Sequence, residues 1–216
     1  MKSSTQITTG TPFVARFASW KLWIASAVIF VPFAWMFFAS SAPFSIPEVE
    51  AACGQAPPDM RFFTSADGVT RFLDDCGTNG RDTYRNMQLA DIFYPAIIGV
   101  FLTSSLSLAI KRLSSRPGRT LWLAALPLAA MAFDYLENIL AWLALTSYPD
   151  PNATTHLLGV ASAAKTTTSW AAGLLLLAAV AAIVVQAATA RLSGANTDTS
   201  VASDPADQRE LVGSGS

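Results

Sequence analysis

Four long apolar stretches separate the few charged segments of this 216-residue chain. They cover about residues 22–39, 90–110, 121–145 and 157–185. A helix needs about 20 mostly apolar residues to cross a bilayer, and its backbone polar groups are then satisfied internally. Hydrophobic residues make up 52% of the chain and charged residues only 13%, which argues against a water-soluble domain. We therefore predict an all-α membrane protein whose four transmembrane helices form an antiparallel bundle within residues 19–190.

The distribution of Lys and Arg predicts the orientation of this bundle, because short cytoplasmic segments are enriched in basic residues. The connection at residues 146–156 contains no Lys or Arg. We expect a plasma (inner) membrane protein with a cytoplasmic lead at residues 1–18 and a disordered cytoplasmic tail at residues 191–216. The basic residues on the expected cytoplasmic side are Lys2, Arg16, Lys21, Lys111, Arg112, Arg116, Arg119 and Arg191.

The first apolar stretch leaves one alternative open, which is cleavage as a signal peptide after the small residues 39–42. Its apolar run of about 18 residues is longer than the usual signal core of about 7–15. The net charge of −1 provides no basic surface for nucleic acid. The lipid bilayer is therefore the expected partner, and nucleic acid is not.

An exterior loop at residues 40–89 contains both cysteines of the chain, Cys53 and Cys76. An oxidising exterior favours a disulfide between them, which would stabilise the fold by about 3 kcal/mol in the chain-entropy model. The alternative is two unpaired thiols. The chain has no C-x-x-C pair and a single His, so we expect neither a metal site nor a cofactor.

Local signals predict that this loop is partly helical. Its Pro-rich first part, residues 43–58, is expected to be extended or turning. A helix is then predicted from Thr64 or Ser65 as N-cap to Gly77. Residues 81–88 are expected to extend the second apolar helix outward, with Pro95 bending that helix. The apolar positions of the loop helix share one face, which consists of Val69, Phe72, Leu73 and Cys76.

Polar residues inside the third apolar stretch are the strongest functional signal. Asp134, Glu137 and Asn138 fall on one face of a helix because they are three and four residues apart. Each carboxylate costs about 2.5–3.5 kcal/mol to insert at the bilayer centre. The fourth stretch supplies a counter-charge in Lys165, with Thr168 and Ser169 nearby.

Depth supports a pairing between these two helices. Glu137 and Lys165 each lie about 12 Å below the outer end of their helix, given a rise of about 1.5 Å per residue. We therefore predict a polar pocket that opens to the exterior, in which Asn138 and Thr168 orient the acids. Its mouth is expected to be lined by Asp91, Tyr94 and His156.

Three functional hypotheses follow, and a purely structural role for the polar groups is the alternative to all of them. An interhelical polar contact stabilises a membrane protein by only about 0.6 kcal/mol on average. Inserting three ionisable groups into the membrane costs more than such contacts return, which argues against a purely structural role. The leading hypothesis is a pocket that binds or translocates a small ligand or a proton.

The second hypothesis is a non-catalytic subunit that docks a membrane protein partner through the exterior loop. It would use the disulfide and the face of Val69, Phe72 and Leu73. The third is an intramembrane enzyme acting on a lipid-like substrate, although no known catalytic motif is present.

Three short motifs carry a family resemblance. They are Gly80-Arg81-x-x-Tyr84, Asp91-x-x-Tyr94-Pro95 and Asp134-x-x-Glu137-Asn138. Because of these motifs, the chain resembles uncharacterised bacterial four-helix membrane proteins over roughly residues 60–170. The resemblance implies the four-span architecture and carries no activity with it.

Overall fold

The computed structural model describes residues 13–114, 118–150 and 153–201. Every regular element in these ranges is helical, so the prediction of an all-α chain is confirmed for this part of the protein. The elements are η1 (Phe13–Phe17), α1 (Trp20–Ala39), α2 (Ile46–Cys53), η2 (Pro58–Met60), α3 (Ala66–Ala90), α4 (Tyr94–Leu113), η3 (Arg119–Ala125), α5 (Leu126–Ser147) and α6 (Ala153–Val201).

Four helical segments are long and apolar enough to cross a membrane: Trp20–Ala39, Ala66–Leu113, Thr120–Ser147 and Thr154–Arg191. Much of their apolar surface faces outward. Trp35 on α1 is 63% exposed and Leu177 on α6 is 67% exposed. Large exposed apolar faces of this kind are typical of helices that contact an apolar environment or another protein.

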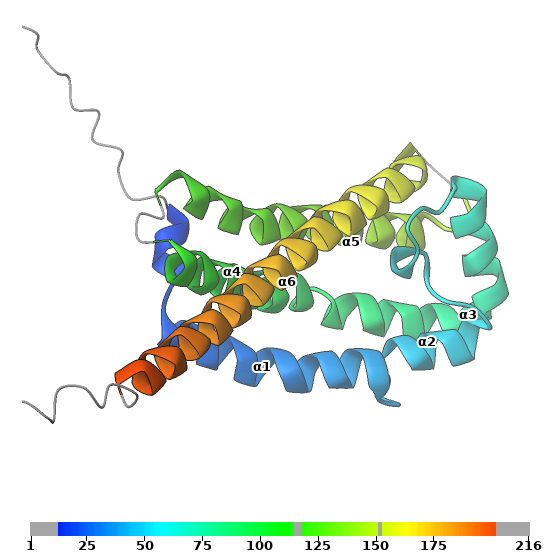
Figure 1. The fold of residues 1–216 in the computed structure, drawn as a ribbon. Coiled ribbons are helices and arrows are strands. Elements are labelled where there is room, and N and C mark those ends of the chain that lie inside the picture. Colours follow the sequence, from blue (N-terminus) through cyan, green and yellow to red (C-terminus); the bar gives the residue numbers. More distant parts are fainter. Residues whose placement is uncertain (1–12, 115–117, 151–152, 202–216) are drawn as a thin grey trace, which may run out of the picture.

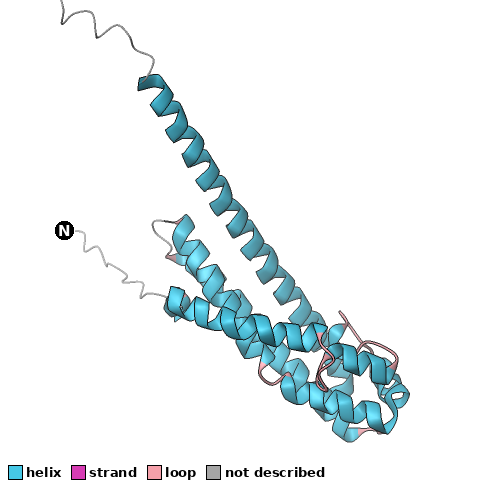
Figure 2. Ribbon diagram, turned by 90° about the horizontal axis from the view of Figure 1, so that it is seen from below, coloured by secondary structure: helices cyan, strands magenta, loops and turns pink. Residues whose placement is uncertain are grey.

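Helix α4 lies at the centre of the bundle and packs against α1, α5 and α6 (Figure 1). The most extensive contact between two helices is that of α5 with α6. Helix α1 packs against α4 and α2 but makes no substantial contact with α6. Figure 2 shows α6 diverging from the other helices toward its C-terminal end. Two cavities are lined by residues of α1, α4 and α6, and we call the region between α1 and α6 that contains them the groove.

The exterior-loop elements α2, η2 and the first half of α3 gather at one end of the bundle (Figure 1). The predicted disulfide between Cys53 and Cys76 is present and joins α2 to α3. The face of Val69, Phe72 and Leu73 is buried in a hydrophobic core cluster that also includes Leu140 of α5. It packs within the protein and is not available to a partner, so the docking face predicted for a subunit role is wrong.

The Pro-rich part of the loop is more ordered than we predicted, because residues 46–53 form α2. Pro47 lies in the first turn, where its missing N–H removes no helical hydrogen bond. The Ser45 hydroxyl accepts a hydrogen bond from Glu48 N (3.3 Å), and Gly54 ends the helix with a φ of 70°.

Helix α3 has the predicted N-cap, Ser65, and a kink at Gly77, where φ is 58°. Its predicted continuation into α4 is present within one helical segment, Ala66–Leu113, but is interrupted by a short turn. Helix α3 ends at Ala90, residues 91–93 form a turn, and α4 begins at Tyr94 with Pro95 in its first turn. Proline has no N–H to bond to the preceding turn, so the regular helical hydrogen bonding is interrupted just before Pro95.

Contacts at the other end of the bundle involve η1. Val14 is fully buried, and its carbonyl accepts a hydrogen bond from Ser107 Oγ on α4 (3.3 Å). The predicted lead therefore includes a packed segment, while residues 1–12 lie outside the described residues. Helix α6 continues to Val201, so the predicted disorder is wrong for residues 191–201. Residues 202–216 and Arg116 also lie outside the described residues.

Candidate functional site

Lys165 on α6 makes the predicted pairing with the two acids of α5. It forms an ion pair with Glu137 Oε2, and its Nζ lies 3.6 Å from Asp134 Oδ1. The Glu137 side chain is fully buried, whereas 12% of Asp134 and 19% of Lys165 is accessible. The fixed rise of the two packed helices places these charges at the same depth.

Asp59 is a third acid at this site, and sequence reasoning missed it. Lys165 Nζ donates a hydrogen bond to the Asp59 carbonyl oxygen (3.0 Å), which holds η2 against α6. The Asp59 side chain is buried, and its Oδ2 accepts a hydrogen bond from Gln88 Nε2 (2.9 Å). Burial raises the pKa of the Asp59 carboxyl, although the positive charge of Lys165 opposes this effect. The Pro57-Pro58 pair before Asp59 restricts the backbone conformation there. However, no feature of the sequence around Asp59 indicates that η2 packs against the long helices.

Asp91 adds a fourth buried carboxyl group near this cluster. Its carbonyl oxygen accepts a hydrogen bond from Asn138 Nδ2 (3.0 Å), which fixes the turn between α3 and α4 on α5. The positive charge of Lys165 therefore acts on the carboxyl groups of Asp59, Asp134 and Glu137, and Asp91 lies near the same acids. Such an imbalance at low dielectric favours the uptake of positive charge, as a proton or as a cationic ligand.

Several buried polar atoms in this region have no hydrogen-bond partner in the described part of the chain. Except for one hydroxyl, all of them can only accept a hydrogen bond. An unpartnered buried group costs about 1–3 kcal/mol, so the cluster favours a ligand that donates hydrogen bonds. The atoms are Asp59 Oδ1, Tyr84 OH, Gln88 Oε1, Glu137 Oε1 and Asn138 Oδ1.

A pocket of about 400 Å³ borders the cluster. Asp59, Asp134 and Lys165 form its polar wall. The rest of its lining is mainly apolar or aromatic and comes from α1, η2, α4, α5 and α6. We call it the carboxylate pocket, and its other lining residues are Phe38, Met60, Tyr94, Ile98, Gly99, Leu102, Pro127, Ala130, Met131, Thr166, Ser169 and Trp170.

The exposed lining residues show where the carboxylate pocket opens. Phe38 on α1, Met60 on η2, and Ser169 and Trp170 on α6 are all exposed. The opening therefore lies at the side of the bundle, between α1 and α6 and next to η2. The sequence predicts an opening at the exterior end instead, because it does not reveal where η2 lies.

The other predicted site residues divide into two groups. Tyr94 and Ser169 line the carboxylate pocket. His156 is exposed and does not line it, so its predicted place at the mouth is wrong. Thr168 Oγ1 donates to Ala164 O (2.7 Å) within α6, and Asn138 donates to the Asp91 carbonyl. Neither side chain orients the acids as we predicted.

The Gly80-Arg81-x-x-Tyr84 motif has a structural explanation. A Cβ on Gly80 would lie 3.0 Å from Cys53 Sγ, so glycine allows α3 to pass close to the disulfide. Arg81 donates to Leu73 O (2.9 Å) across the kink at Gly77, and its guanidinium lies 4.6 Å from the centre of the Tyr148 ring. Tyr84 is buried against Phe72 and belongs to the polar cluster.

Comparison of the chain with known family models, with curated proteins and with solved structures found no match. The interpretation of the site therefore depends on its own geometry.

Proposed function

We propose that this chain is a multi-pass membrane protein that binds a small, partly apolar cation in the carboxylate pocket. The observation that carries the proposal is the excess of buried carboxyl groups over the single ammonium of Lys165 at the pocket wall. When the pocket is empty, protons or water would occupy the unpartnered acceptors.

The membrane placement is supported by the outward-facing apolar side chains of α1 and α6. Four candidate spans and a Lys/Arg-free connection between α5 and α6 fit the predicted topology, with both termini cytoplasmic. Charged groups within membrane spans commonly mark ligand or proton sites, because their insertion is costly.

The chemistry of the lining supports a cation that also has apolar surface. Asp134 lines the cavity and is partly accessible, so its carboxyl group can contact a ligand there. Tyr94, Phe38 and Trp170 supply aromatic rings, whose faces attract cations. An anion would meet several carboxyl groups and a lysine that is already paired.

Binding of two organic ions of matched size tests the proposal. Tetraphenylphosphonium and tetraphenylborate have the same shape and opposite charge, and equilibrium dialysis against detergent-solubilised protein measures both. We expect saturable binding of the phosphonium that Asp134→Asn weakens about tenfold, the equivalent of about 1.4 kcal/mol.

Asp82→Asn is the control, because Asp82 is exposed and pairs with Arg85 at a distance from the pocket. This variant should bind the phosphonium like the unaltered protein. Equal binding of the two ions, or equal effects of Asp82→Asn and Asp134→Asn, would refute a cation site.

The subunit hypothesis has weaker support, because the face assigned to docking is buried. Phe62 (61% exposed) and Phe63 (54% exposed) remain at that end of the bundle. The enzyme hypothesis gains no catalytic group from the structure. We therefore keep cation binding as the proposed function.

A further inference from the structure

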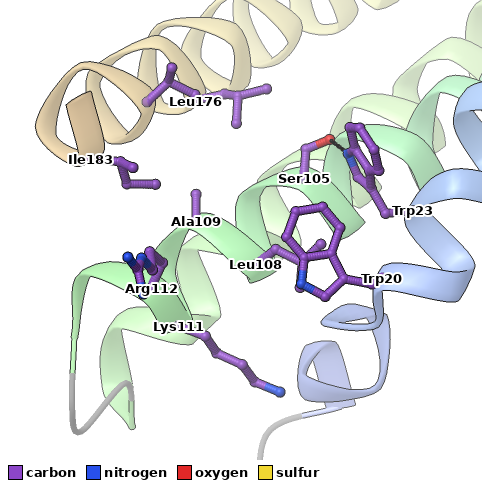
Figure 3. Close-up of a pocket in the computed structure, with 10 residues that line it drawn as sticks. Trp20, Trp23, Ser105, Leu108, Ala109, Lys111, Arg112, Leu176 and Ile183 are labelled. Atoms are coloured by element: carbon purple, nitrogen blue, oxygen red, sulfur yellow. Dashed lines mark hydrogen bonds between the residues drawn. The ribbon is translucent and has the colours of Figure 1, made fainter. Parts of the chain in front are cut away.

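A second cavity lies in the same groove between α1 and α6, beside the basic end of α4 (Figure 3). Its volume of about 580 Å³ is within the range of about 300–1,000 Å³ typical of small-molecule sites. We call it the basic pocket. It is lined by Trp20, Trp23, Ser105, Leu108, Ala109, Lys111, Arg112, Leu176, Val180 and Ile183.

The basic pocket has an apolar interior and a cationic rim. Leu108, Ala109, Leu176 and Ile183 project from α4 and α6 in Figure 3. Lys111 and Arg112 are consecutive residues at the end of α4, and their side chains point toward different sides of the pocket rim. None of the lining residues is acidic. The charge of this cavity is thus opposite to that of the carboxylate pocket.

The two basic side chains are available to a ligand. Both are exposed, and neither forms an ion pair with any residue in the described ranges. Lys111 Nζ makes only a long contact with Ala15 O (3.5 Å). Adjacent Lys and Arg groups without a carboxylate partner are suited to the oxygens of a phosphate.

Two tryptophans complete the wall on α1. Trp23 Nε1 donates to Ser105 Oγ (2.9 Å), which fixes its ring against α4. The nitrogen of the Trp20 ring is turned toward the end of the pocket where Lys111 lies (Figure 3). Indole rings favour the boundary between acyl chains and headgroups, because they combine an apolar body with one N–H donor.

We propose that the basic pocket holds one anionic phospholipid of the cytoplasmic leaflet. Its phosphate lies at Lys111 and Arg112, and one acyl chain follows the groove past Leu176 and Val180. Charge complementarity selects an anionic headgroup, and the apolar interior requires an attached chain. The site differs in position and charge from the one assigned to the cation.

Native mass spectrometry of the full chain in detergent tests this proposal by counting bound lipids. We expect one phosphatidylglycerol to bind more tightly than phosphatidylcholine of the same chain length. The double substitution Lys111→Gln with Arg112→Gln should weaken phosphatidylglycerol binding about 30-fold and leave phosphatidylcholine binding nearly unchanged.

Arg191→Gln is the matched control, since Arg191 is an exposed cation on α6 outside the basic pocket. It should retain binding within about twofold. Val180→Trp tests the acyl-chain part separately: Val180 is 47% exposed, so the larger ring fills the cavity from its open side without disturbing the core. This variant should weaken binding of both lipids about tenfold.

Three outcomes would overturn the proposal. The first is an unchanged preference for phosphatidylglycerol in the double variant. The second is an equal loss in Arg191→Gln, which would indicate general surface attraction. The third is displacement of the lipid by excess inorganic phosphate, which would indicate a free-anion site. If the double variant elutes as an aggregate, Arg112→Gln alone tests the headgroup contact, and Val180→Trp still tests the acyl-chain contact.

Discussion

Lys165 connects three separate parts of the chain at the scale of single residues. Its ammonium group contacts Glu137 and Asp134 on α5 and the backbone carbonyl of Asp59 on η2. One side chain therefore holds the exterior loop on the bundle and balances part of the buried negative charge. Its removal affects both functions.

Replacing Lys165 by Met should lower the free energy of unfolding by about 3–5 kcal/mol, because Glu137 is left as an uncompensated buried charge. The double variant Lys165→Met with Glu137→Gln should lose less than the single one. Thermal unfolding followed by tryptophan fluorescence measures both. A double variant as unstable as Lys165→Met would show that the pair is not coupled.

The pH dependence of stability tests the environment of Asp59. Its pKa is raised from 3.8 in the folded state, so the folded protein binds more protons than the unfolded chain above about pH 3.8. The contribution of Asp59 to the free energy of unfolding therefore decreases as pH rises from about 3.8 to above the pKa that Asp59 has in the folded protein. At higher pH this contribution stays constant. Lys165 and Asp134 are the charges that act on it most strongly.

Asp59→Asn should flatten this decrease without lowering stability near neutral pH, because the amide oxygen still accepts the hydrogen bond from Gln88. Midpoints of thermal unfolding between about pH 4 and pH 8 would show the difference. A variant with the same pH slope as the unaltered protein would contradict the assignment.

At the scale of elements, the position of η2 depends on a close approach between the exterior loop and α6. A Cβ on Gly159 would lie 2.3 Å from Thr64 O and 2.8 Å from Phe63 Cε2. Glycine is therefore required where the loop crosses α6, about one and a half turns before Lys165. This contact supports the hydrogen bond between Lys165 and Asp59 O.

Gly159→Ala should lower the free energy of unfolding by about 1–3 kcal/mol, because the backbone of the loop has to shift. Amide hydrogen exchange should speed up in residues 57–64 and not in α4. Gly173→Ala is the control on the same helix, since a Cβ there meets nothing within 4 Å. Faster exchange in Gly173→Ala as well would indicate a general effect on α6.

Helix pairing was more predictable than the path of the loop. The constant rise of a helix was enough to match Glu137 with Lys165 in depth. The same periodicity could have excluded His156, which lies nine residues before Lys165 and therefore on the opposite face of α6. Asp59 was not predictable, because its place results from long-range contacts of η2 with α5 and α6. The break at residues 91–93 follows from Pro95, whose missing N–H leaves the Asp91 carbonyl without its helical donor, but the sequence does not show that Asn138 donates to that carbonyl.

At the scale of the whole molecule, the exterior-loop elements and the basic end of α4 lie at opposite ends of the bundle (Figure 1). This arrangement agrees with a membrane crossing in which the disulfide faces an oxidising compartment. The side chains between the two ends include the most exposed apolar residues of α1 and α6.

Labelling with a membrane-impermeant maleimide tests this topology in intact cells. Both native cysteines are bonded to each other, so they should react little. A cysteine introduced by Asp150→Cys, in the connection between α5 and α6, should react at once. Gly118→Cys, at the other end of the bundle, should react only after the cells are permeabilised. The reverse pattern would invert the proposed orientation.

The separation of α1 from α6 determines how a ligand reaches either cavity. Both cavities have exposed lining residues on α1 and α6, so in a bundle that spans a membrane as proposed, molecules dissolved in the bilayer would enter from the side by two-dimensional diffusion. Occupancy would then follow the concentration of a compound in the membrane and not its concentration in water. Among cations of equal charge, those that partition more strongly into lipid should therefore occupy the carboxylate pocket at a lower total concentration.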